Sequence, residues 1–284
     1  MAGEIRKVGV VGLGAMGAGI AQLCIEAGLE TVGREVTLEL AEKAQANIAH
    51  FLTRKVEKGQ LEQDARDAAV ARLSLTADVG DLADCDVVIE AIVESLAPKQ
   101  ELFRELERVC LADAVLATNT SALSVTEIAA AISTPERVVG MHFFNPAPLM
   151  PLVEIVRAEL SSDEASELAF SLGARLGKHP IRCFDTPGFV VNRVLIPVLN
   201  DAVRVLDEAR VTVEDLDAGM KYGTGWPMGP CELIDLIGID VHVHAADALY
   251  EKTHEPRMAA PPRLVAMKNA GLLGRKTGRG FYTY

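Results

Sequence analysis

The stretch that decides the fold is KVGVVGLGAMGAGI, residues 7–20. Its apolar run from Val8 to Val11 predicts a buried strand, and residues 15–27 have the composition of a helix. Between them lies Gly12-x-Gly14-x-x-Gly17, a spacing that binds a dinucleotide when a strand precedes it and a helix follows. Gly12 makes the tight turn, Gly14 lets the backbone approach a pyrophosphate, and Gly17 allows close packing of the helix on the strand.

The flanking residues extend this prediction to the whole cofactor. The helix that begins at Ala15 and Met16 should receive the phosphates at its N-terminus. Residues 30–34 are a plausible second strand, and Glu35 follows it as an acceptor for the adenosine ribose hydroxyls. A carboxylate there would repel a 2′-phosphate, whereas the neighbouring Arg34 could hold one. Because the carboxylate is present, the sequence favours NAD over NADP.

Composition limits the class of protein. The chain has 284 residues, enough for two domains, and carries 28 Lys and Arg against 40 Asp and Glu, for a net charge of −12. This balance argues against a nucleic-acid binder, and an anionic ligand would need a local concentration of positive charge. No apolar run approaches the roughly 20 residues of a membrane span. Five scattered cysteines without a CxxC pair, and an N-terminus with no room for a cleaved signal, suit a reduced cytoplasmic protein.

Strand-like runs recur through the first two thirds of the chain and alternate with helical patterns. They lie at residues 86–91, 114–118, 138–141, 151–156 and 180–183. This alternation predicts an α/β fold, a Rossmann-type and mostly parallel sheet over residues 1–185. The charged helical pattern at 37–72, broken at Gly59, is longer than a simple crossover needs and predicts a projecting helical hairpin. Cations of that hairpin could meet phosphates or form a solvated basic face.

After Asp185-Thr186-Pro187-Gly188 the pattern becomes helical to the end of the chain. Apolar periodicity predicts helices at residues 189–209, 231–250 and 262–270. We therefore expect residues 186–284 to form a helical domain, whose apolar faces serve either as its own core or as a dimer interface.

A nucleotide-binding domain predicts a cofactor but no particular reaction, so the reaction depends on side chains near the nicotinamide. Oxidation of an alcohol needs a base for the hydroxyl proton, and His142 stands at the carboxyl end of a predicted strand. A lone histidine there could be structural, but Glu154 lies inside an apolar strand and would need a partner, so the two can form a base and its orienting acid. His242 and His244 face different sides of a helix, which argues against a metal site. Ser124 with Glu127 indicates a helix capping box.

Seven motifs occur in an order that resembles the 3-hydroxyacyl-CoA dehydrogenases, especially the short bacterial 3-hydroxybutyryl-CoA dehydrogenases. They are GLGAMGAGIAQ at 12–22, EAIVESLAPKQELF at 90–103, NTSALSV at 119–125, HFFNPAPLMPLVEIV at 142–156, PGFVVNRVLIPVLNDA at 187–202, GWPMGPCELIDLIGID at 225–240 and GRKTGRGFYTY at 274–284. The resemblance covers nearly the whole length.

The resemblance implies roles for individual residues. His142 looks like the catalytic base and Glu154 like its partner. Ser121 and Asn192 match positions that hydrogen-bond the substrate oxygen and help orient the histidine. The positions that match cofactor contacts are Glu94, Lys99, Asn145 and, from the C-terminal tail, Lys276. The hairpin lysines Lys55 and Lys58 match the region that contacts coenzyme A.

The implied protein is a homodimeric, NAD-dependent dehydrogenase of 3-hydroxyacyl thioesters, with a Rossmann domain and a helical dimerising domain. Two departures keep alternatives open. Gly33 and Arg34 replace part of an apolar strand that usually ends in Asp, and Phe51 stands where some relatives have a polar residue facing the coenzyme A. The alternatives are the same reaction on an acyl carrier protein, a related dehydrogenase of a non-thioester hydroxy acid, or a non-catalytic nucleotide-binding protein. The intact set of residues 121, 142, 154 and 192 argues against the last.

Overall fold

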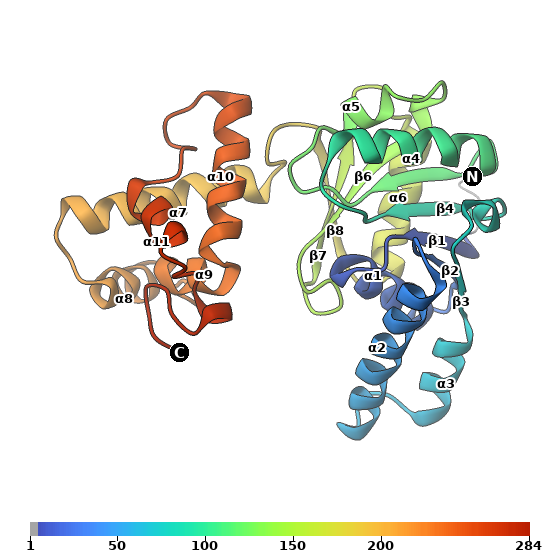
Figure 1. Ribbon diagram of the computed structural model, residues 1–284, viewed down its shortest axis with the longest axis horizontal. Coiled ribbons are helices and arrows are strands. Elements are labelled where there is room, and N and C mark those ends of the chain that lie inside the picture. The colour runs from blue at the N-terminus through green and yellow to red at the C-terminus, as the bar shows by residue number, and fades with distance from the viewer. Residues whose placement is uncertain (1–4) are drawn as a thin grey trace. The chain divides into compact units, whose positions relative to one another are not determined.

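The computed structural model describes residues 5–284, and the chain falls into two compact units that divide between Thr186 and Pro187 (Figure 1). The division lies one residue from the boundary expected from the sequence.

The first unit is built on an eight-stranded sheet with the order β3-β2-β1-β4-β5-β6-β7-β8. The strands are β1 (Lys7–Val11), β2 (Glu30–Arg34), β3 (Leu73–Thr76), β4 (Val87–Glu90), β5 (Val115–Thr118), β6 (Val138–Phe143), β7 (Leu152–Arg157) and β8 (His179–Phe184). The central strands are buried along nearly their whole length, as expected for parallel strands covered on both faces. The mostly parallel α/β fold expected from the sequence is thus confirmed.

Helices connect the strands and complete the core. In this unit they are α1 (Ala15–Glu26), α2 (Leu38–Glu57), α3 (Gln63–Ala71), α4 (Leu96–Val109), α5 (Val125–Ala129) and α6 (Asp163–Arg175), with short 3-10 turns at Val79–Leu82 and Pro135–Arg137. One core cluster joins Ile20 and Ile25 of α1, Ile89 of β4 and Leu172 of α6. α2 and α3 lie side by side as a hairpin that extends away from the sheet (Figure 1). Gly59, at φ +67°, follows α2 and ends it.

Two strands differ from the sequence expectation. β3 is absent from the prediction, because its four residues form a short edge strand with no continuous apolar run. β6 extends to Phe143 rather than ending at Met141, so His142 lies inside the strand. β6 pairs with β7 in an antiparallel ladder that sets His142 directly opposite Glu154.

The second unit contains five α-helices within residues 187–284. They are α7 (Val191–Glu208), α8 (Val213–Thr224), α9 (Pro230–Ile237), α10 (Ile239–Thr253) and α11 (Pro262–Asn269), followed by the 3-10 turn η3 (Arg275–Thr277). The single helix predicted at 231–250 is wrong, since Gly238 at φ +100° separates α9 from α10. In the part of the chain that the structure describes, no helix has the length and apolarity to cross a bilayer.

Candidate active site

The glycine turn has the geometry that a pyrophosphate requires. Gly12 adopts φ +86°, and a Cβ there would lie 2.8 Å from the carbonyl oxygen of Ala91. A Cβ on Gly17 would lie 1.7 Å from the Gly12 oxygen, whereas no atom lies within 4 Å of a Cβ on Gly14. α1 begins directly after Gly14 with no side-chain cap and no acidic residue in its first turn, which contains Ala15 and Met16. The open N-terminus of α1 therefore fits the phosphates of a dinucleotide.

Glu35 is fixed beside this turn. Its Oε1 accepts a hydrogen bond of 2.7 Å from the Leu13 N–H, and its Oε2 accepts one of 2.9 Å from the Val36 N–H. A carboxylate has further lone pairs, so Glu35 can still accept ribose hydroxyls. The backbone oxygen of Arg34 accepts from the Gly12 N–H at 2.9 Å, so Arg34 also adjoins the turn.

His142 and Glu154 form a buried pair across the β6–β7 ladder. The His142 Nδ1 lies 2.6 Å from Glu154 Oε2, and Glu154 is fully buried while His142 is 6% exposed. The ring of Phe144 packs against the imidazole with 4.5 Å between centroids. Because Nδ1 is engaged by the carboxylate, the ring orientation is fixed, and any proton transfer by His142 would use Nε2.

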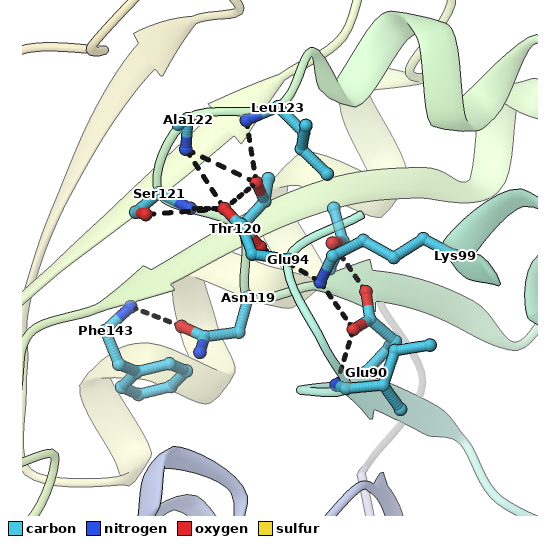
Figure 2. Close-up of polar contacts among 11 residues, drawn as sticks. Glu90, Glu94, Lys99, Asn119, Thr120, Ser121, Ala122, Leu123 and Phe143 are labelled. Atoms are coloured by element: carbon cyan, nitrogen blue, oxygen red, sulfur yellow. Dashed lines mark hydrogen bonds and ion pairs between the residues drawn. The ribbon is translucent and has the colours of Figure 1, made fainter. Parts of the chain in front are cut away.

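Ser121 lies on the loop after β5, the strand beside β6. Asn119, at the start of that loop, accepts a 2.9 Å hydrogen bond through Oδ1 from the Phe143 N–H, and this bond ties the loop to the end of β6 (Figure 2). Sequence reasoning missed Asn119, although a polar residue directly after a buried strand was the available signal. The structure therefore connects the Ser121 loop to the residue that follows His142.

Glu94 anchors the other side of the loop. Its Oε1 accepts from the Ser121 N–H at 2.8 Å, the Thr120 hydroxyl at 2.7 Å and the Ala122 N–H at 3.2 Å (Figure 2). Burial alone would raise the pKa of Glu94, but Lys99 and these donors outweigh it and hold the pKa below its ordinary value. Glu94 is therefore ionised at neutral pH.

Lys99, expected from the sequence to contact the cofactor, is fully buried behind Glu94. Its Nζ lies 2.6 Å from Glu90 Oε1 and 3.3 Å from Glu94 Oε2. Glu90 was not singled out from the sequence, because a glutamate at the end of a buried strand gives no sign of its partner.

A groove of about 810 Å³ extends from the glycine turn along one face of α2. It is lined by residues 13–15 and Glu35, by α1, and by the segment at 145–149 that contains Asn145. Lys178 donates to the carbonyl oxygens of Ala147 and Met150 and so holds that segment in place. The groove thus begins where a dinucleotide would bind and continues along the hairpin.

The α2 face of the groove gathers positive charge in an acidic protein. Its cations are Lys43, Arg54 and Lys55 of α2, together with Lys58 directly after the helix. Lys55 Nζ also pairs with Glu26 at 2.5 Å, and Phe51, 55% exposed, adds an aromatic surface between the cations. An elongated anionic ligand with an aromatic part fits this combination. The groove lining does not include His142 or Ser121.

Two predicted site residues belong to the second unit. Asn192 is in the first turn of α7, and Lys276 in η3 pairs with Asp240 Oδ1 at 2.5 Å. Their proposed contacts with substrate and cofactor stay predictions. Ser124 caps α5 by accepting from the Glu127 N–H at 3.1 Å, which is one half of the capping box expected from the sequence. Across residues 5–284, no group of three or more His, Cys, Asp or Glu side chains is placed to hold a metal ion.

Both units match models of known protein domains. The model of the NAD-binding domain of 3-hydroxyacyl-CoA dehydrogenase matches residues 7–186, and the model of the C-terminal domain of 3-hydroxyacyl-CoA dehydrogenase matches residues 188–284.

Individual relatives are similar over at least 91% of their length. A 3-hydroxybutyryl-CoA dehydrogenase of Mycobacterium tuberculosis is 44% identical in an alignment of 286 positions that covers 100% of both chains. The human mitochondrial hydroxyacyl-coenzyme A dehydrogenase is 40% identical, with 99% of this chain and 91% of the relative covered. The solved structure of (S)-3-hydroxybutyryl-CoA dehydrogenase from Ralstonia eutropha superposes with a TM-score of 0.95 at 40% identity, covering 99% of each chain.

Proposed function

This chain belongs to the 3-hydroxyacyl-CoA dehydrogenase family, and we propose that it interconverts short 3-hydroxyacyl and 3-oxoacyl thioesters of coenzyme A. It is an oxidoreductase with an NAD-binding domain. The observation that carries the proposal is the buried His142–Glu154 pair, with 2.6 Å between Nδ1 and Oε2, at the carboxyl end of a Rossmann strand.

His142 is the general acid and base of the proposed reaction. The nicotinamide, when bound, supplies the hydride acceptor or donor. In the oxidation, His142 Nε2 removes the proton of the substrate 3-hydroxyl while the hydride leaves the carbon that bears this hydroxyl. The imidazolium that forms is stabilised by the Glu154 carboxylate at Nδ1. In the reduction, the same imidazolium returns the proton to the developing alkoxide.

Ser121 is the proposed donor to the substrate oxygen. Its backbone is held by Glu94, while the hydroxyl contact with Glu94 is the longest of that set at 3.3 Å. A hydroxyl in so long a contact can turn to a substrate oxygen at low cost. Asn192 is proposed as the second group that orients the substrate, on the resemblance of its motif alone.

The carrier of the acyl group is proposed to be coenzyme A. The cations of α2 and Lys58 suit the phosphates of its nucleotide part. Phe51 departs from the polar residue of some relatives, but its exposed ring offers the adenine an aromatic surface. An acyl carrier protein shares the phosphopantetheine but lacks that nucleotide.

Steady-state rates with matched substrates test the carrier. We expect kcat/KM to be highest for acetoacetyl-CoA, lower for acetoacetyl-pantetheine, and lowest for acetoacetate. A higher kcat/KM with acetoacetyl-acyl carrier protein would overturn the coenzyme A assignment.

The preferred cofactor is proposed to be NAD, because the fixed Glu35 carboxylate would repel a 2′-phosphate. The same assay with NADH and then NADPH tests this choice. A higher kcat/KM with NADPH would show that Arg34, rather than Glu35, decides the preference.

We also propose a homodimer that works in the cytoplasm. Apolar side chains are exposed on three helices of the second unit: Val194 is 63% exposed, Leu236 50% and Val241 51%. Contiguous exposed apolar surface favours association, and we propose that these side chains belong to the dimer interface. The five cysteines are free thiols, as a reducing compartment allows. Sedimentation equilibrium at micromolar concentration measures the mass, and a monomer would contradict the dimer.

A further inference from the structure

A chain of three charged side chains, two of them fully buried, lies beside the Ser121 loop (Figure 2). Lys99 is at its centre, with Glu90 on one side and Glu94 on the other. Lys99 and Glu90 are both 0% exposed, and the side chain of Glu94 is 32% exposed. Only the Glu94 end of the chain therefore reaches solvent.

Glu90 is fully satisfied by its neighbours. Its Oε1 accepts from Lys99 Nζ at 2.6 Å and from the Ile92 N–H at 2.7 Å, and its Oε2 accepts from the Thr118 hydroxyl at 2.7 Å. Thr118 is the last residue of β5 and Glu90 the last of β4. The Glu90 carboxylate thus holds the Lys99 ammonium against the ends of β4 and β5, the strands that precede the loops of Glu94 and Ser121.

Glu94 uses its two oxygens differently. Oε1 receives the donors of residues 120–122, whereas Oε2 faces Lys99 Nζ at 3.3 Å. The ammonium therefore fixes the orientation of the carboxylate that holds the Ser121 loop. The Nζ of Lys99 already contacts two carboxylates inside the protein, which leaves it poorly placed for a ligand.

We propose that Lys99 is a positioning residue that acts on catalysis through Glu94 and the Ser121 loop, not through contact with the cofactor. The inference deepens the proposed function and rests on the role of Ser121 in it. Without the ammonium, Glu90 and Glu94 would be two carboxylates with no cation between them. Their repulsion would turn Glu94 away and release the N–H groups of Ser121 and Ala122.

The test compares Lys99→Met with Lys7→Met, a control that removes a lysine from the more exposed ion pair with Asp84 in the same unit. For Lys99→Met we expect kcat with acetoacetyl-CoA to fall ~10-fold or more, while the Kd for NADH stays within about 2-fold of the parent value. The control should leave both quantities near the parent values.

A double-mutant cycle with Ser121→Ala tests the route of the effect. If Lys99 acts through the Ser121 loop, Lys99→Met should reduce kcat far less in the Ser121→Ala background than in the parent. If the kcat of the double variant falls by the product of the two single losses, the proposal is overturned. A rise of ~10-fold in the Kd for NADH at unchanged kcat in Lys99→Met would also overturn it.

A second variant covers the case in which Lys99→Met does not fold. Lys99→Met with Glu90→Gln removes the buried pair together and leaves no uncompensated charge at Glu90. Glu94 still loses its cation, so the same loss of kcat is expected, and a parent-like kcat would overturn the proposal. Full activity of Ser121→Ala alone would instead contradict the proposed role of Ser121, a result that is separate from the behaviour of the Lys99 variants.

Discussion

Replacing Glu154 with glutamine removes the charge that we propose stabilises the His142 imidazolium, and it keeps the size of the side chain. The two groups are 2.6 Å apart, and Glu154 is fully buried, so solvent cannot substitute for the lost charge. A hydrogen bond to a charged group contributes about 1.5–3 kcal/mol. Since about 1.4 kcal/mol corresponds to a tenfold change in rate, kcat should fall roughly 10- to 150-fold.

The rate of NADH oxidation at saturating acetoacetyl-CoA measures this effect. The change in NADH fluorescence on binding gives the Kd of the cofactor. This Kd should stay near the parent value, because three strands of the sheet lie between β7, which carries Glu154, and β1, which precedes the glycine turn. Glu167→Gln is the matched control, since Glu167 pairs with Arg182 at the surface, and its kcat should change less than about 2-fold. A Glu154→Gln variant with parent-like kcat would refute the base and orienting-acid assignment.

Burial lowers the pKa of His242 to about 4. Between pH 4 and about pH 6.5 the unfolded chain therefore binds more protons than the folded chain. As the pH falls from 6.5 to 4, the free energy of unfolding should decrease by roughly 3 kcal/mol. Thermal unfolding across this range should show a smaller pH dependence in His242→Gln. Lys58→Glu should raise the KM for acetoacetyl-CoA ~10-fold and leave that for acetoacetyl-pantetheine unchanged, and equal changes in both would contradict a phosphate contact. Gly17→Ala places a Cβ 1.7 Å from the Gly12 oxygen, so both NADH affinity and Tm should drop, and a parent-like Kd would contradict the close packing of α1.

The strongest sequence signals were those with a strict geometric meaning. Gly12 and Gly17 have the turn and the close contact that their spacing predicts, and the strands at β1, β2, β4 and β5 lie within a residue or two of the expected positions. The apolar runs were informative because parallel strands are buried on both faces. β3 was missed since a short edge strand has no such run.

The partners of polar residues were harder to predict. The sequence suggested that Glu154 needed a partner, but only the antiparallel register shows why His142 provides it. Lys99 carried a motif-based role at the cofactor, yet its contacts with Glu90 and Glu94 depend on the spacing between β4 and α4. Asn119 joins two strand ends that are 24 residues apart along the chain. Such contacts arise from tertiary packing, which periodicity does not encode.

The most direct test of the account is the turnover of His142→Ala with acetoacetyl-CoA and NADH. General acid–base catalysis contributes about 10²- to 10⁴-fold, so kcat should fall at least ~100-fold. The Kd for NADH should stay within about 2-fold of the parent value, because the glycine turn and Glu35 are unchanged. A near-normal kcat in this variant would contradict the assignment of His142 as the group that transfers the substrate proton.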